Sequence, residues 1–422
     1  MNLTTSPVPL ARRVAALAAL WCATAAPAEV NPYFVGLSQT LTQESNLLRL
    51  SSGQDTPDGY SRSDSLSVTS LLAGFDQSFG RQHAYANLSL RDGHYSRNSA
   101  FNNQGYTANA GLDWSTIERV SGSLSLSTNR ALSNFNNYGV GLLASKNLET
   151  TDGLNASFNV GLVTEYSLVA SAGHRQVRNS LDNPTLKARD FDQDNVSLGL
   201  RWRPRGGTML GFNLGTTLGR YPSYQINSDG SRQADRFQQP TLDLLGNLQP
   251  SGSSSLDARL SYSKTRYDLN QQRNFSGLTG TLGWAWQPGG KTRLSTRLSR
   301  DTGQNFYAVT VFGVPGLSDY SQVVNTFRVQ ADYDVTAKIT LSVSAQLNQR
   351  NIVNTVQNLF MPIESSGKDR TTLLGLSARW SPLRSLQFGC DLSQETRRAN
   401  GQLTSDLDNR AVSCFGQFQL QQ

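Results

Sequence analysis

Long stretches of the sequence alternate strictly between apolar and polar residues. In 106–114, apolar residues from Tyr106 to Trp114 occupy every even position, and Thr, Asn, Gly and Asp occupy the odd positions. A period of two residues is the mark of a β-strand with one apolar and one polar face. A short polar turn follows Trp114, and a second alternating run begins at Val120. Because this unit recurs down the chain, it predicts an all-β fold of antiparallel hairpins.

The connections between the alternating runs are of two kinds. Tight polar turns fall at 79–82, 114–119, 163–166, 202–207, 248–252, 286–290, 333–338 and 380–384. Longer polar stretches fall at 42–64, 92–104, 133–150, 174–190, 220–236, 265–275, 300–324, 349–370 and 395–409. Nine long loops that alternate with eight tight turns predict about 18 strands, within a range of 16–20.

The apolar face of each strand indicates a membrane environment. Mean hydropathy is −0.41, and no run of 18 apolar residues follows residue 28, which excludes a bundle of transmembrane helices. A barrel needs apolar residues only at alternate positions, and a charge at the lipid-facing midplane costs about 2–4 kcal/mol. We therefore predict a transmembrane antiparallel β-barrel with short periplasmic turns and long extracellular loops. The alternative is a large soluble β-sandwich or β-solenoid.

A Trp or Tyr directly precedes five of the tight turns. Trp and Tyr favour the interface between membrane and water, so these residues predict an aromatic girdle at the periplasmic side. The predicted girdle consists of Trp114, Trp202, Trp286, Tyr333 and Trp380. The girdle and the export signal described next favour the membrane barrel over the soluble alternatives.

Residues 1–28 have the organisation of a secretory signal peptide. Arg12 and Arg13 precede an apolar stretch, 14–26, that is too short to span a bilayer, and Ala26-Pro27-Ala28 fits a cleavage site. We expect a mature chain of one barrel domain, 29–422, in the outer membrane of a Gram-negative bacterium. Its 36 basic and 31 acidic residues give a net charge of about +5, against +7 for the whole chain.

Basic residues recur on the polar face of the strands, which lines the lumen of a membrane barrel. The alternation predicts nine of them there: Arg91, Arg201, Arg203, Arg259, Lys291, Arg293, Arg297, Arg328 and Arg379. Five aspartates share that face: Asp113, Asp243, Asp257, Asp332 and Asp391. A basic excess favours anionic solutes, because lumen charges focus the field in a narrow channel. The alternative is a charged lumen whose residues neutralise each other.

Catalytic and metal-binding patterns are weak in this sequence. His83, His94 and His174 are predicted near strand ends, and an outer-membrane hydrolase would need one of them paired with Ser or Asp. Only Asp92 lies close to a histidine in sequence, so we expect no enzyme, no metal site and no cofactor. Basic residues are spread along the strands and not clustered, which argues against nucleic acid as a partner.

Cys390 and Cys414 are the only cysteines beyond the signal peptide. In the alternation of their strands, both cysteines fall on the apolar face. The midpoint of the sequence between them lies in the last long loop. In a symmetric hairpin they would lie opposite each other on adjacent strands. A disulfide is one interpretation in an oxidising compartment. We favour two free lipid-facing thiols, because directly opposed strand positions seldom meet disulfide geometry without strain.

Several segments together resemble one family. They are Asn31–Gly36, Ser45–Leu50, Arg62–Asp64, Phe75–Gln82, Tyr106–Trp114, Arg201–Pro204 and Gly219–Pro222. These segments are similar to those of EpsL-type proteins, which are outer-membrane β-barrels associated with exosortase and extracellular polysaccharide gene clusters. The likeness runs along most of the chain after residue 28.

The resemblance implies a channel for the export of extracellular polysaccharide, with no energy source of its own. The partners it implies, together with the barrel fold, are outer-membrane lipid, an anionic polysaccharide, the barrel assembly machinery and periplasmic export proteins. Two alternatives remain from the residues alone. One is a general diffusion porin for small anionic solutes, and the other is an outer-membrane hydrolase.

Overall fold

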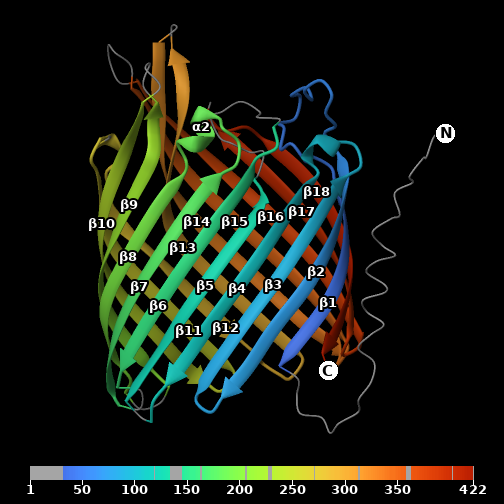
Figure 1. Cartoon of the computed structure of the whole chain (residues 1–422), viewed down its shortest axis with the longest axis vertical. Helices are drawn as coiled ribbons and strands as arrows, with labels where there is room; N and C mark the ends of the chain where they lie inside the picture. Colours follow the sequence, from blue (N-terminus) through green and yellow to red (C-terminus); the bar gives the residue numbers. More distant parts are fainter. Residues whose placement is uncertain are drawn as a thin grey trace, which may run out of the picture.

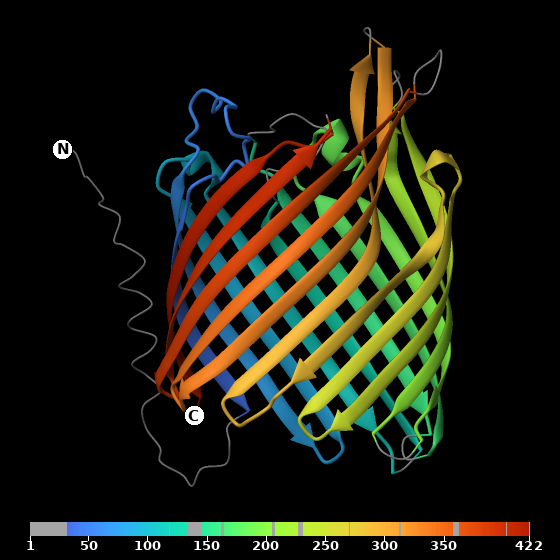
Figure 2. The same ribbon diagram turned by 180° about the vertical axis from the view of Figure 1, so that it is seen from behind.

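The fold is a closed barrel of 18 antiparallel strands, seen in a computed structural model (Figures 1 and 2). The structure describes residues 32–421 except 118, 134–144, 162–163, 205–206, 227–230, 270, 312–313, 358–362 and 402. The strands are β1 Tyr33–Glu44, β2 Asp64–Phe79, β3 Gln82–Tyr95, β4 Asn103–Ser115, β5 Val120–Leu132, β6 Leu148–Val160, β7 Tyr166–Asn179, β8 Phe191–Trp202, β9 Met209–Ile226, β10 Arg232–Ser251, β11 Ser254–Tyr267, β12 Phe275–Trp286, β13 Thr292–Val311, β14 Val314–Thr336, β15 Ile339–Gln357, β16 Ile363–Leu383, β17 Leu386–Asn400 and β18 Leu407–Gln421.

Each strand pairs with its neighbours in sequence, and β1 closes the barrel against β18. That last ladder runs from the pair Phe34 and Gln421 to the pair Glu44 and Ala411. Closure leaves no free sheet edge, which a membrane-spanning sheet requires because lipid offers no hydrogen-bond partner. The prediction of an antiparallel barrel with 18 strands is confirmed.

The alternation of the sequence becomes the two faces of the barrel wall. Apolar side chains on the outer face are widely exposed, for example Leu198 at 61% and Leu214 at 57%. Their neighbours in sequence point to the interior and are mostly polar. A wall one strand thick has no buried core of its own, so the outer face needs lipid contact for stability.

The short connections gather at one end of the barrel and the long ones at the other (Figure 1). Between β2 and β3, Gly80 has φ +63°, a conformation that glycine adopts without steric cost. The long connections hold three one-turn helices: η1 Ser99–Phe101, α2 Pro184–Lys187 and η2 Gln271–Arg273. No helix in the described ranges is long and apolar enough to cross a bilayer.

Three of the predicted extracellular loops are too long. Strands β13 and β14 continue as a hairpin through most of 300–324, and it protrudes beyond the barrel (Figures 1 and 2). Strands β15 and β16 likewise fill much of 349–370, and β9 and β10 much of 220–236. Above the membrane both faces of a strand meet water, so the pairing persists without the apolar alternation that marks a strand in sequence.

Buried apolar residues cluster at the extracellular end. Leu47, Leu48 and Leu50 from the β1–β2 loop pack with Phe101 of η1, and all four are at most 8% exposed. The helix α2 approaches both β9 and β13, so it lies over the mouth of the barrel. The predicted signal peptide, 1–28, and most of the predicted loop 133–150 fall outside the described residues.

Candidate functional site

The lumen wall is the surface on which the predicted basic residues gather. Leu298 and Phe327 on the outer face are 46% and 41% exposed. The intervening Arg297 and Arg328 therefore point to the interior, where they stand directly opposite each other on β13 and β14. The strand alternation places Arg91, Arg201, Arg259, Arg293 and Arg379 on the same face of the wall.

Two of the nine predicted lumen residues lie beyond strand ends, at the periplasmic rim. Arg203 follows β8 and donates a hydrogen bond to Ser167 Oγ at 2.7 Å. Lys291 precedes β13 and is exposed in the turn after β12. At both places the alternation in the sequence extends one residue beyond the end of the strand. Arg203 and Lys291 therefore lie at the periplasmic end of the lumen and not along its wall.

Ion pairing divides the nine cations into two groups. Arg293 contacts Asp334 at 2.8 Å and Arg379 contacts Asp391 at 3.5 Å. In the described part of the chain, the other seven have no carboxylate within 4.0 Å: Arg91, Arg201, Arg203, Arg259, Lys291, Arg297 and Arg328. The basic excess that the sequence predicted therefore stays largely uncompensated at contact distance.

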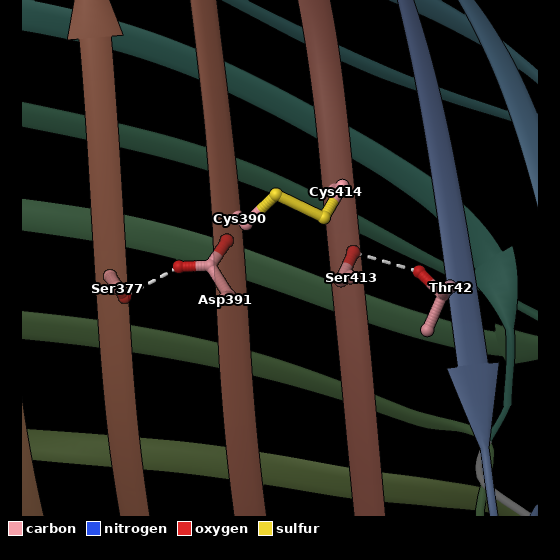
Figure 3. The surroundings of a disulfide bond; sticks show 6 residues. All are labelled: Thr42, Ser377, Cys390, Asp391, Ser413 and Cys414. Atoms are coloured by element: carbon pink, nitrogen blue, oxygen red, sulfur yellow. Dashed lines mark hydrogen bonds between the residues drawn. A yellow bond between two sulfur atoms is a disulfide. The ribbon is translucent and has the colours of Figure 1, made fainter.

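Hydroxyl groups donate hydrogen bonds to several of the lumen aspartates, including Asp391, which also contacts Arg379. Ser261 donates to Asp243 at 2.5 Å, and Ser342 donates to Asp332 at 2.6 Å. Ser377 donates to Asp391 at 2.5 Å (Figure 3). These bonds run across neighbouring strands and hold the carboxylates against the wall, so they brace the ladder.

Three exposed arginines form what we call the arginine arc: Arg259, Arg297 and Arg328. Arg259 lies on β11, and its partner Thr281 on β12 is opposite Ser299, two residues from Arg297. Arg297 and Arg328 are cross-strand partners. Asp257, two strands from Arg297, is the carboxylate nearest in register, with Gly283 between them. Guanidinium groups present planar forks of donors that match carboxylate, sulfate and phosphate oxygens.

The three histidines make no nucleophile–base arrangement with a serine among the described residues. His83 contacts Asp76 at 2.8 Å and Asp113 at 3.6 Å at the periplasmic end. His174 contacts Asp194 at 2.7 Å, and both lie on the outer face. His94 is 3.8 Å from Asp92, the pair singled out from sequence. None of these contacts includes the hydroxyl that a hydrolase of this kind would use.

The aromatic residues of the predicted girdle lie at the periplasmic strand ends and on the outer face. Trp202, Trp286, Tyr333 and Trp380 are 38–49% exposed. Trp114 packs against Phe158 of β6 in a tilted arrangement, with ring centroids 5.9 Å apart. Trp284 joins Trp286 in a stacked pair, with 5.7 Å between the ring centroids. The predicted girdle did not include Trp284, because it was drawn only from residues that directly precede a turn.

Cys390 and Cys414 are joined in a disulfide between β17 and β18, with a Cα–Cα distance of 4.1 Å (Figure 3). The two residues are cross-strand partners, as the midpoint argument predicted, but the expectation of free thiols is wrong. The neighbouring Ser413 points to the other face, where its hydroxyl is 2.8 Å from that of Thr42 on β1. The bond therefore lies on the lipid side of the barrel, between β17 and β18, next to the seam between β18 and β1 that closes the barrel.

Sequence reasoning gave no role to the segment Ser45–Leu50, and the structure supplies one. Asn46 donates to the Leu50 carbonyl at 2.7 Å and accepts from the Leu50 amide at 2.9 Å, which folds the segment into a closed turn. Arg49, at φ +57°, pairs with Glu44 at 3.1 Å and with Glu395 of β17. The segment ties the first loop to the strands on both sides of the closing seam.

A second buried network lies at the extracellular end of β9–β12. Arg273 of η2 is 2% exposed, contacts Asp235 at 3.2 Å and stacks 4.1 Å from the ring centre of Tyr267. Burial raises the pKa of Asp235, although two backbone hydrogen bonds and Arg273 oppose the shift. Burial likewise raises the pKa of the Tyr267 hydroxyl. These residues lie above the lipid-facing belt, and we interpret them as the support of the extracellular rim.

No protein-family model matches the sequence, and no characterised protein matches it at the level of sequence. Among solved structures, the FrpB iron transporter from Neisseria meningitidis is similar with a TM-score of 0.47 and 10% identity, over 93% of this chain and 83% of that chain. OccK9 (OpdG) of Pseudomonas aeruginosa gives 0.46 and 13%, over 92% and 98%. The outer membrane protein OpdK of the same organism gives 0.45 and 15%, over 92% and 99%.

Proposed function

We propose that this protein is an outer-membrane channel for the export of an anionic extracellular polysaccharide. The observation that carries the proposal is the arginine arc, three exposed guanidinium groups on one lumen wall with no carboxylate at contact distance in the described chain. An anionic polymer in the lumen would compensate this charge. The resemblance to EpsL-type proteins supplies the expectation that the polymer is a polysaccharide.

The arc is suited to guiding a moving polymer more than to holding a single ligand. Its arginines are exposed and lie within four consecutive strands, β11 to β14. They have few hydrogen bonds to the wall; among the described residues, Arg328 donates only to Gln330, at 3.3 Å. An exposed guanidinium exchanges partners at little cost, so a chain of carboxylates or sulfates could pass from one arginine to the next. We expect the driving force to come from synthesis of the polymer or from periplasmic partners.

The first test is ion selectivity in a planar bilayer. We expect anion-preferring conductance that an anionic oligosaccharide blocks, and we expect the triple variant R259Q/R297Q/R328Q to lower the anion preference roughly threefold or more. The matched control is R81Q/R119Q/R384Q, which removes three exposed cations from the periplasmic turns. Unchanged selectivity in the triple variant would refute the role of the arc.

The second test separates export from diffusion. A strain that lacks the protein should lose secreted polymer, and the arc variant should restore it only in part. The alternative, a diffusion porin for small anionic solutes, would leave polymer secretion intact in that strain. It would also admit small sugars into liposomes at a rate that depends on solute size, so the two assays together distinguish the alternatives.

A further inference from the structure

Cationic side chains gather on the outer face of the barrel, outside the lumen. Arg220 of β9, Arg236 of β10, and Lys264 and Arg266 of β11 all project outward and are exposed. We call these four residues the outer cation cluster. Arg220 and Arg236 are direct cross-strand partners, and Arg266 is opposite Gln238, one diagonal step from Arg236.

The cluster lies at the height of lipid headgroups. Lys264 is ten residues beyond Ser254, the periplasmic start of β11. At about 3.3 Å per residue and a tilt of about 40°, that distance is roughly 25 Å, the height of the apolar belt of such barrels. Two residues below the cluster, Leu218 and Tyr262 are 51% and 47% exposed on the same outer face. The belt therefore ends where the cations begin, on the extracellular side.

The cations of the cluster are not neutralised by the protein. In the part of the chain that the structure describes, none of the four has an ion pair or a side-chain hydrogen bond. Asp192, opposite Arg220, is engaged by Arg178. Asp268 follows β11 beside Arg236 and donates its amide to the Arg236 carbonyl, but its carboxylate makes no contact with the cluster. Like charges at directly opposed strand positions are destabilising, so this arrangement has a cost that the fold does not offset.

We propose that the outer cation cluster binds the phosphates of a phosphorylated glycolipid in the outer leaflet. A lipid is the occupant that fits, because its phosphates stand at the headgroup level while its acyl chains cover the apolar belt directly below. Arginines and a lysine on three adjacent strands present donors to more than one phosphate group. The site is separate from the lumen, so it does not depend on what the channel carries.

The proposal is tested with the whole barrel in mild detergent, by native mass spectrometry against added diphosphoryl lipid A. We expect the wild type to bind it. The variant R220Q/R236Q/K264Q/R266Q should bind it with an affinity at least about tenfold lower. The variant R81Q/R119Q/K338Q/R384Q removes the same residue types from the periplasmic turns and should bind as the wild type does. Heat-modifiable migration on gels verifies that each variant is folded.

Three further arms make the test decisive. Arg-to-Lys changes at 220, 236 and 266 should retain binding, since the charge remains, and they serve if the quadruple variant fails to fold. Lipid A without phosphates should bind no better to the wild type than to the quadruple variant. Equal binding of diphosphoryl lipid A by both proteins would overturn the proposal, and so would full displacement of the lipid by inorganic phosphate at equal concentration.

Discussion

Arg350 and Arg297 are both strand arginines that face the interior of the barrel, yet their surroundings differ. Arg350 lies near the extracellular end of β15, where its guanidinium is bonded to Asp369 of β16 and the two side chains are 11% and 2% exposed. Arg297 lies on the open lumen wall, exposed and directly opposite another arginine. The same residue type therefore serves the fold at the rim and is exposed in the lumen along the wall.

The comparison teaches that burial distinguishes an arginine that stabilises the fold from one that is available to a ligand. Residue type and the face of the strand do not distinguish them. A buried charge must be paired, because its desolvation is costly. An exposed charge in a wide lumen keeps its water and needs no partner, so its presence adds little to stability. Variants that remove one residue of each kind should then differ in what they change.

The largest expected effect is loss of stability on breaking the buried pair. Asp369→Asn removes the carboxylate charge of an ion pair that is almost closed to solvent, and we expect a cost of about 3–5 kcal/mol. This loss of unfolding free energy is measured by unfolding the refolded barrel in detergent with guanidinium chloride and recording tryptophan fluorescence. The matched control is Asp391→Asn, in a pair whose side chains are 46% and 38% exposed. We expect less than about 1 kcal/mol there, and equal losses in both variants would contradict the comparison.

The disulfide should give the next largest effect, and it acts through the unfolded chain. Cys390 and Cys414 are 24 residues apart, and a closed loop of that length stabilises by about 3 kcal/mol in the chain-entropy account. We expect C390S/C414S to unfold at a lower temperature than the oxidised wild type. Wild type that is reduced while unfolded and then refolded should match the variant. If reduction lowers the stability of the serine variant as well, the effect does not come from this bond.

Much of the barrel could be predicted because its physics is local. The alternation around Trp114 or Leu341 is imposed by lipid on one face and water on the other, and it marks each strand without knowledge of its neighbours. The extracellular rim could not be predicted in this way. The Asn46 amide donates to the side chain of Asn409, 363 residues away on β18, and no sequence period records such a contact.

The candidate site was predicted in part, and the limit is again the difference between local and long-range information. Parity placed Arg259, Arg297 and Arg328 on one face, but it did not show that Arg293 would reach Asp334 while Arg297 would have no carboxylate beside it. Asp332 is the cross-strand partner of Arg293, yet Arg293 bonds the next inward residue on that strand. Such choices depend on side-chain reach across the wall.

The smallest expected effect is therefore at Arg293, and it tests the comparison most closely. Arg293 holds Asp334 with two hydrogen bonds, at 2.8 and 3.1 Å, in an exposed site near the periplasmic end of the lumen. Arg293→Gln removes the same charge as Arg297→Gln, from an inward position four residues away on the same strand. Because Asp334 remains, the local net charge falls by the same amount, but no unengaged guanidinium is lost.

We expect no measurable change in the unfolding midpoint for either variant. Block of the conductance by an anionic oligosaccharide should be weaker for Arg297→Gln and unchanged for Arg293→Gln. Equal loss of block in both would show that lumen charge alone, and not the availability of the guanidinium, determines recognition of the polymer.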